Sequence, residues 1–367
     1  MLENIPADEP QQIQHIVELM REQLQNRYPD EVRVRRGVHA KGHGCVTATF
    51  EILPDIAANL RQGVFAQTGK TYSAFVRFSN ADPSFVKPDS KPAVNGAPVE
   101  HGSRGMAIKL LGVEGNMLGA VHGAPTQDFL MVNQPVFAFA NVEDYEVLSR
   151  VLVDNHDDAG PFFTERLAPT APPAAQLRAK ETFEIVSRVR SPSTTATPPA
   201  FQIPPASPVD NDYFSASPFL LGPDQVMRFR VRPSCRSLDA PDVSDPDYLR
   251  TALVNRLADQ DAGEVVFHFE IQARPASSIV PDNDIENASH DWPETPDCQF
   301  EHVATLTIPI QEFDTPELQE RCERFVFTPW HCLEDHRPLG GINRLRRAVY
   351  EESAMFRNLP KEPVAVN

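Results

Sequence analysis

Residues 36–42 of the chain read RGVHAKG, and residues 346–350 read RRAVY. The first stretch places a histidine, His39, just before a glycine-rich run that leads into an alternating apolar–polar segment. The second places Tyr350 one helical turn after Arg346, so that both side chains lie on one face of a helix. Together the two stretches predict an acid–base histidine and a phenol whose ionisation is favoured by a neighbouring guanidinium.

The chain between these stretches is dominated by segments in which apolar and polar residues alternate. Such alternation is typical of strands with one buried and one polar face, which belong in antiparallel sheets. The segments are residues 46–52, 74–79, 104–111, 127–132, 227–232, 267–272 and 304–308. There are enough of them to close a barrel, so the predicted fold class is α+β, with a closed antiparallel β-barrel and flanking α-helices.

Helices are predicted at both ends of the chain. The first lies within residues 1–30, with Asp8 as its expected cap and an apolar stripe formed by Ile13, Ile16, Met20 and Leu24. The last lies within residues 338–360, with Asn343 as its expected cap and Pro360 as its end. Residues 168–223 are rich in proline and predict an excursion over the surface with one short helix around residues 176–189. We expect residues 1–367 to form a single domain.

The composition excludes several classes of partner. Acidic residues outnumber basic ones by 51 to 34, and the net charge of −17 disfavours nucleic acid and anionic membranes. No apolar run is long enough to cross a bilayer, and the acidic first twenty residues do not resemble a signal peptide. The cysteines are Cys45, Cys235, Cys298, Cys322 and Cys332. Their odd number and scattered positions argue against a disulfide framework or a cysteine zinc site and predict a cytoplasmic protein.

Three further polar side chains are candidates for a site with His39. Asn133 lies in the run VNQPVF at residues 132–137, and Arg77 and Ser79 share one face of a predicted strand. Each has a structural alternative, since Asn133 suits a turn before a proline and Arg77 suits a solvent-facing strand. The sequence does not decide which face of this strand points inward.

Five segments of the chain, in the same order, resemble the catalase superfamily, and more closely its short branch of catalase-related haem peroxidases. RGVHAKG at 36–42 is similar to the distal-histidine segment, and NQPVF at 133–137 is similar to the distal-asparagine segment. VRFS at 76–79 is similar to the propionate-arginine strand, and RGMAIK at 104–109 to the strand after it. RRAVY at 346–350, with Arg357, is similar to the proximal pattern. The resemblance implies a catalase-like barrel of about eight strands.

The resemblance also implies a cofactor, haem b, and a role for each matching residue. Tyr350 is the implied iron ligand, and Arg346 supports its ionisation. Arg36, Arg77 and Arg357 are the implied partners of the haem propionates, and Val38, the catalase-type residue before the histidine, belongs to the haem-contacting set. His39, hydrogen-bonded by Ser79, and Asn133 are the implied catalytic groups that receive peroxide.

We therefore expect an enzyme, a catalase-related haem peroxidase that reduces hydrogen peroxide or organic hydroperoxides with an organic electron donor and has weak catalase activity. Residues 82–103 depart from the pattern of large catalases, because HGSRG at 101–105 replaces the usual Asp-Pro-Arg-Gly lead-in, and this favours wider access to the site.

Two alternatives stay open. The first is a fatty-acid hydroperoxide isomerase or dehydratase resembling allene oxide synthases, which Val38 disfavours because that position resembles threonine in them. The second is a non-catalytic haem-binding or peroxide-sensing protein, which has no use for His39 together with Asn133. The preferred peroxide, the donor and whether the chain forms a homo-oligomer are also open.

Overall fold

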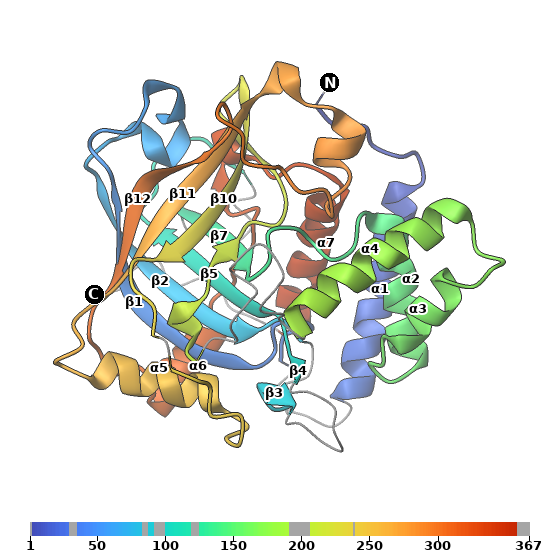
Figure 1. The fold of residues 1–367 in the computed structure, drawn as a ribbon, viewed down its shortest axis with the longest axis horizontal. Coiled ribbons are helices and arrows are strands. Elements are labelled where there is room, and N and C mark those ends of the chain that lie inside the picture. The colour runs from blue at the N-terminus through green and yellow to red at the C-terminus, as the bar shows by residue number, and fades with distance from the viewer. Residues whose placement is uncertain are drawn as a thin grey trace.

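The computed structural model describes residues 2–28, 35–82, 87–91, 100–118, 125–190, 206–237 and 239–357. At its centre is a closed antiparallel barrel, seen on the left of Figure 1. The barrel strands are β1 (Gly42–Ile52), β2 (Thr71–Asn80), β5 (Arg104–Leu111), β7 (Thr126–Val132), β8 (Tyr213–Phe214), β10 (Gln225–Pro233), β11 (Val265–Pro275) and β12 (Phe300–Ile308). They pair in the order β11-β12-β1-β2-β5-β7-β8-β10, and the pairing of β10 with β11 closes the ring. The predicted α+β fold with an eight-stranded barrel is confirmed.

The remaining elements surround this barrel. The short strands are β3 (Ser90–Lys91), β4 (Glu100–His101), β6 (Met117–Leu118), β9 (Phe219–Leu221) and β13 (Cys332–Leu333). The helices are α1 (Glu9–Arg27), α2 (Val142–Asp154), α3 (Gly160–Arg166), α4 (Pro173–Arg190), α5 (Tyr248–Ala258), α6 (Pro316–Glu323) and α7 (Gly341–Phe356). Of the helices in the described ranges, none is long and apolar enough to cross a membrane.

The barrel interior is filled by one face of each strand, as the alternating pattern predicts. In β1 the side chains of Val46, Phe50 and Ile52 are fully buried, while the intervening Thr47 and Glu51 are exposed. Phenylalanine rings from several strands meet at the centre. The ring of Phe129, for example, lies 4.8 Å from that of Phe269 and 5.1 Å from that of Phe229, measured between centroids.

On one side of the barrel the outer face of the sheet is also buried. β2, β5 and β7 are buried on both faces over most of their length, whereas β12 keeps partly exposed residues along its outer face. The cover is a second apolar cluster, formed by Phe75, Ala107, Leu130, Phe325 and Phe327. Arg77 and Ser79 follow Phe75 on the same strand face. The candidate site therefore lies outside the barrel but inside the molecule.

A helical layer completes this covered side. Figure 1 shows α1 to α4 on the right of the barrel, with α7 between them and the strands. Ile16 of α1, Val142 of α2 and Leu345 of α7 form a common apolar cluster, so the predicted stripes of the first and last helices pack against each other. Asp8 stands at the N-cap of α1, but its side chain caps no backbone N–H of the helix.

Residues 168–223 hold more regular structure than their proline content predicts. The short helix expected around residues 176–189 is α4, which extends from Pro173 to Arg190. The end of the range contributes β8, whose Tyr213 is fully buried in the barrel core, and β9. Residues 191–205 lie outside the described residues.

Candidate functional site

The helix that carries Tyr350 begins earlier than the sequence predicts. We expected Asn343 to cap it, but α7 starts at Gly341 with Gly340 as its N-cap. Gly340 has a φ of 85°, and a side chain there would collide with the Ile285 carbonyl. Asn343 instead lies inside the helix, where its amide donates to the carbonyl groups of Pro218 and Leu339. The predicted end at Pro360 lies outside the described residues.

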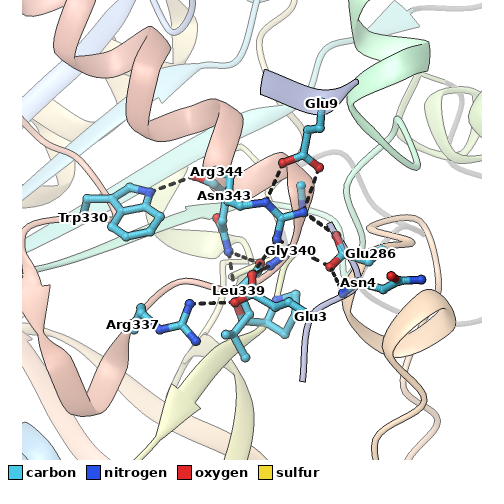
Figure 2. A network of polar contacts seen from close by, with 12 residues as sticks. Glu3, Asn4, Glu9, Glu286, Trp330, Arg337, Leu339, Gly340, Asn343 and Arg344 are labelled. Carbon is cyan, nitrogen blue, oxygen red and sulfur yellow. Dashed lines mark hydrogen bonds and ion pairs between the residues drawn. The ribbon is translucent and has the colours of Figure 1, made fainter. Parts of the chain in front are cut away.

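Carboxylates from distant parts of the chain anchor the start of α7 (Figure 2). The backbone N–H of Gly340 donates to Glu3 at 3.0 Å and that of Gly341 to Glu286 at 2.9 Å, as expected at the positive end of a helix dipole. The Arg344 guanidinium binds Glu3 at 2.6 Å, Glu9 at 2.6 Å and Glu286 at 2.8 Å. These contacts fix the helix against α1 and against the segment after β11.

Tyr350 lies two turns further along α7, on the face that covers the barrel. Its ring is partly buried and packs against the cluster of Phe75, Ala107, Leu130, Phe325 and Phe327. The Arg346 guanidinium carbon lies 5.7 Å from the centre of the Tyr350 ring, and its Nη1 donates to the Asn343 side chain at 3.1 Å. The predicted pair thus shares one helix face.

A second tyrosine, which the sequence did not single out, stands beside this pair. Tyr145 of α2 lies close enough to Tyr350 for the two phenols to interact electrostatically. Burial, and then Tyr350, raises the pKa of Tyr145 to about 12. Its phenol therefore stays protonated and neutral.

His39 has an unusual backbone conformation held from two sides. Its φ is 55°, in the left-handed region that only a few per cent of non-glycine residues adopt. The Arg36 Nε donates to the His39 carbonyl at 3.0 Å. The His39 Nδ1 and the Ser79 hydroxyl are 3.0 Å apart, so the predicted pairing of these residues is present in the geometry. Strained residues of this kind cluster at functional sites.

The environment of His39 keeps its imidazole neutral. Burial, followed by the charges of Arg77, Arg36 and Arg346, lowers the pKa of His39 to about 3. The contribution of Arg346 indicates that the Arg346-bearing face of α7 lies near the His39 segment. In the tautomer in which Nδ1–H donates to Ser79, Nε2 carries the lone pair that can accept a proton.

Space for the His39 ring depends on a glycine in a neighbouring strand. Gly105 of β5 pairs with Ser79 of β2 across the sheet. A Cβ built on Gly105 would overlap the Nδ1 and Cε1 atoms of His39 and lie 3.1 Å from the Ser79 hydroxyl. The sequence contained Gly105 within a motif but gave no signal of this role, which depends on the strand register.

Asn133 follows β7 and is tied to the start of β5. Its Oδ1 accepts the backbone N–H of Arg104 at 2.7 Å, and its own backbone N–H donates to the Arg104 carbonyl at 3.0 Å. These bonds fix the orientation of the amide, so that Nδ2 is left as the donor toward a ligand. Arg104 is itself held by the Asn80 side chain and the Asp89 carbonyl.

The three arginines expected to hold carboxylates converge on a carboxylate of the protein. Arg36 Nη1 binds both oxygens of Glu323 at 2.8 Å. Burial alone would raise the pKa of Glu323, but the charges of Arg36 and Arg77, with a contribution from Arg357, hold it below the ordinary value. Glu323 ends α6 and was not predicted, because its place in the site depends on tertiary contacts.

Arg77 differs from Arg36 in having hydrogen-bonding capacity left over. Its guanidinium carbon lies 4.3 Å from the centre of the Phe327 ring, and its Nη1 is buried without a hydrogen-bond partner. Burial, followed by the charge of Arg36, lowers the pKa of Arg77. An unpaired buried guanidinium of this kind is costly unless an anion binds to it.

Val38 and His331 have different surroundings. Val38, next to His39, is 41% exposed, in contrast to the buried Arg36 two residues earlier. His331 lies 3.3 Å from Asp128, which Lys109 also binds at 2.8 Å. Within the described ranges, His, Cys, Asp and Glu side chains form no group of three that could hold a metal ion.

The residues present fit a haem. Haem offers an apolar macrocycle, two carboxylates and an iron that accepts a phenolate. Against these the site has the apolar cluster around Phe327, the partnerless Nη1 of Arg77 and the phenol of Tyr350. His39 lies in the same site as a neutral base.

Comparisons with known proteins point to catalases. A family model described as catalase matches residues 10–149, a range that contains His39, Arg77, Ser79 and Asn133 but not α7. No curated protein gives a significant match in sequence.

Solved structures of catalases share the fold. The chain is similar to a fungal catalase with a TM-score of 0.66 and 18% identity, over 92% of this chain and 63% of that one. For catalase A from Saccharomyces cerevisiae the TM-score is 0.65 at 17% identity, over 92% and 65% of the two chains. For a bacterial catalase it is 0.60 at 16% identity, over 94% and 62%. The chain thus spans less than two thirds of the length of these catalases; it shares their fold, and its residues 10–149 match the catalase family model.

Proposed function

We propose that the protein is a haem-dependent enzyme that reduces hydrogen peroxide or organic hydroperoxides, with an organic compound as electron donor. In this proposal Tyr350 is the iron ligand and Arg346 favours the ionised phenol. The propionates are held by Arg77, Arg36 and Arg357. Arg77 is the main partner, because its Nη1 has no hydrogen-bond partner whereas Arg36 already binds Glu323. Bound haem b would supply the electrons that break the oxygen–oxygen bond.

The protein's own part in the reaction is proton transfer at His39. Its neutral Nε2 takes a proton from one oxygen of the peroxide and returns it to the other oxygen, which leaves when the oxygen–oxygen bond breaks. The Ser79 hydroxyl, 3.0 Å from Nδ1, holds the ring from the other side. The Asn133 Nδ2 donates to the peroxide and orients it, since its Oδ1 is already bound to the Arg104 backbone.

One observation carries the proposal. Tyr350 packs against the apolar cluster that contains Phe327, and the Phe327 ring also contacts Arg77. The charges of Arg77 and Arg346 act on the neutral His39 that pairs with Ser79, although three hundred residues separate His39 from Tyr350 in sequence. A carrier of haem needs the tyrosine but has no use for a strained, hydrogen-bonded histidine. This combination supports peroxide chemistry over simple haem storage.

The proposal is tested by steady-state kinetics on the haem-loaded chain. We expect peroxide-dependent oxidation of a phenolic donor, with oxygen release much slower than donor oxidation. His39→Gln should lower kcat/KM for peroxide by about 10²- to 10⁴-fold while haem absorbance stays, because it removes only the proton acceptor.

The other outcomes identify other functions. Rapid oxygen release without donor would make the enzyme a catalase. Consumption of a fatty-acid hydroperoxide without donor, with a rearranged product, would make it an isomerase. A haem-loaded chain that consumes no peroxide would refute the enzymatic proposal and leave haem binding or sensing.

A further inference from the structure

Two cysteines from distant parts of the chain meet at the edge of the proposed haem site. Cys45 lies on β1, directly opposite Arg77 of β2 in the antiparallel register. Cys322 lies in the last turn of α6, next to Glu323. The two thiols lie close enough for each to affect the ionisation of the other, and α6 contacts β1. Some 280 residues of chain separate them in sequence, so their contact is a product of the fold.

The packing of α6 holds this contact in place. The Arg321 guanidinium carbon lies 5.2 Å from the centre of the Phe75 ring, on the outer face of β2. The Phe325 ring, just after α6, lies 4.6 Å from the same Phe75 ring. Cys45 packs against this aromatic cluster. Both sulfur-bearing segments are therefore fixed on one patch of the barrel surface.

The two thiols differ in their readiness to ionise. The neighbouring Cys45, and the positive charges of Arg77 and Arg36, lower the pKa of Cys322 despite its burial. The neighbouring Cys322 and burial raise the pKa of Cys45 well above the ordinary value. Cys322 is thus the thiol of the two that ionises more readily.

The other cysteines have no such arrangement. Cys332 is fully buried, and burial together with the charge of Asp128 raises its pKa far above the ordinary value. Cys235 is exposed, and burial raises the pKa of Cys298. All five cysteines are unbridged in the structure.

We propose that Cys45 and Cys322 form a dithiol that peroxide oxidises to a reversible disulfide between β1 and α6. In the first step the Cys322 thiol loses its proton and the thiolate attacks hydrogen peroxide: a sulfur–oxygen bond forms, the oxygen–oxygen bond breaks and the sulfur loses two electrons. The hydroxide that leaves takes up the released proton and becomes the first water. In the second step the Cys45 sulfur attacks the Cys322 sulfenic acid: the sulfur–sulfur bond forms, the sulfur–oxygen bond breaks, and the Cys45 proton leaves with the second water. A small-molecule dithiol restores both thiols.

The disulfide would act on the carboxylate-binding arginines. Closing the bond fixes the last turn of α6 on β1, and Glu323 belongs to that turn. Glu323 binds Arg36, whose Nε in turn holds the carbonyl group of His39. The oxidation state of the two sulfurs is thereby linked to the position of the proposed peroxide-binding histidine.

The experiment is a thiol and disulfide map of the full chain without added haem, so that its result does not depend on the proposed function. The protein is treated with hydrogen peroxide, blocked with an alkylating reagent, digested without reductant and analysed by mass spectrometry. We expect a Cys45–Cys322 linked peptide that disappears on treatment with dithiothreitol. Cys322 should be oxidised at least tenfold faster than Cys332, the matched buried control.

Two variants separate the steps. In Cys45→Ser the Cys322 sulfenic acid should accumulate and be trapped by dimedone, whereas in Cys322→Ser the Cys45 thiol should stay reduced. If Cys322→Ser fails to fold, as judged by circular dichroism, the wild-type map and the Cys45→Ser variant still show whether Cys322 is oxidised first and linked to Cys45. The proposal is overturned if Cys45 and Cys322 stay reduced at peroxide levels that oxidise the exposed Cys235, or if Cys322 links to another cysteine instead.

Discussion

His39 is held in its conformation by one neighbour in sequence and one neighbour in the fold. Its φ of 55° is stabilised by Arg36, three residues earlier, at the carbonyl group and by Ser79 of β2 at the ring. A left-handed non-glycine residue costs about 1–3 kcal/mol, which the surrounding contacts offset. The placement of the His39 ring thus depends on Ser79 of β2 and Gly105 of β5 together.

Gly105→Ala tests this dependence with a single methyl group. The added Cβ would overlap the His39 imidazole, so the ring must move away from Ser79. We expect kcat/KM for peroxide to fall by about 10²-fold or more, since displacement of about 1 Å costs that much, while haem absorbance is retained. Gly37→Ala is the control, because a methyl group added there would lie 3.7 Å from the nearest side-chain atom, Leu24 Cδ2. Equal rates for the two variants would contradict the role assigned to Gly105.

Residue by residue, the sequence predicted the polar groups of the site better than their partners. His39, Ser79, Arg77 and Tyr350 stand in local motifs. In the structure His39 contacts Ser79, Arg77 contacts the Phe327 ring, and Tyr350 packs against the cluster that includes Phe327. Glu323 was not predicted, since nothing near it in sequence reveals the arginines around it.

Among the elements, α7 is the one whose placement decides the site, because it carries Tyr350 and Arg346. Its first turn is fixed by Glu3, Glu9 and Glu286 through Arg344, whose side chain is only 15% exposed. Burial alone would lower the pKa of Arg344, but the hydrogen bonds and charges of these carboxylates raise it. The N-terminal segment therefore stabilises the helix that carries the proposed iron ligand.

Arg344→Met should destabilise the fold strongly. It removes the cation from three largely buried carboxylates, and breaking one side of a buried ion pair costs about 3–5 kcal/mol in the free energy of unfolding. Arg347→Gln on the same helix is the control: Arg347 is 50% exposed and pairs with Glu351 at 3.4 Å, so its loss should cost under about 1 kcal/mol. Urea unfolding of both variants measures the difference. Similar losses for the two would show that the network of Figure 2 does not anchor α7.

The elements themselves were predictable where a pattern extended over several residues. The long strands β1, β10, β11 and β12 follow from their alternation, and α1 follows from its apolar stripe. β8 has two residues, too few to show a period. The start of α7 was misplaced because it depends on the left-handed Gly340 and on acceptors from Glu3 and Glu286, which are distant in sequence.

Across the whole molecule, several histidines are buried in their neutral form. Burial lowers the pKa values of His43, His101 and His336 to about 4. For His336 the cause is visible in its contacts, because Nε2 accepts the Val64 backbone N–H at 3.0 Å and so has no room for a proton. Unfolding exposes each imidazole to water, where its pKa is near 6.5.

The fold should therefore lose stability as the pH falls from about 6.5 toward 4. In that range the unfolded chain binds protons that the native chain excludes, which costs about 1.4 kcal/mol per pH unit for each such histidine. His336→Gln keeps an acceptor and cannot be protonated. Between pH 7 and pH 5 the fall in its free energy of unfolding should therefore be smaller than that of the wild type, by roughly 2 kcal/mol. Urea unfolding at the two pH values gives this difference, from which the cost of the substitution itself cancels. An unchanged pH dependence would show that His336 does not exclude a proton.

The central claim is that Tyr350 on α7 and His39 before β1 face one haem, and haem titration tests it most directly. The full chain is titrated with haem and followed by absorption, and so is the Tyr350→Phe variant. The control is Tyr145→Phe, because the Tyr145 phenol stays protonated beside Tyr350. We predict that the wild type and Tyr145→Phe bind haem with the same spectrum, whereas Tyr350→Phe binds at least about 100-fold more weakly and with a changed spectrum. Retention of the wild-type affinity and spectrum by Tyr350→Phe would contradict the account.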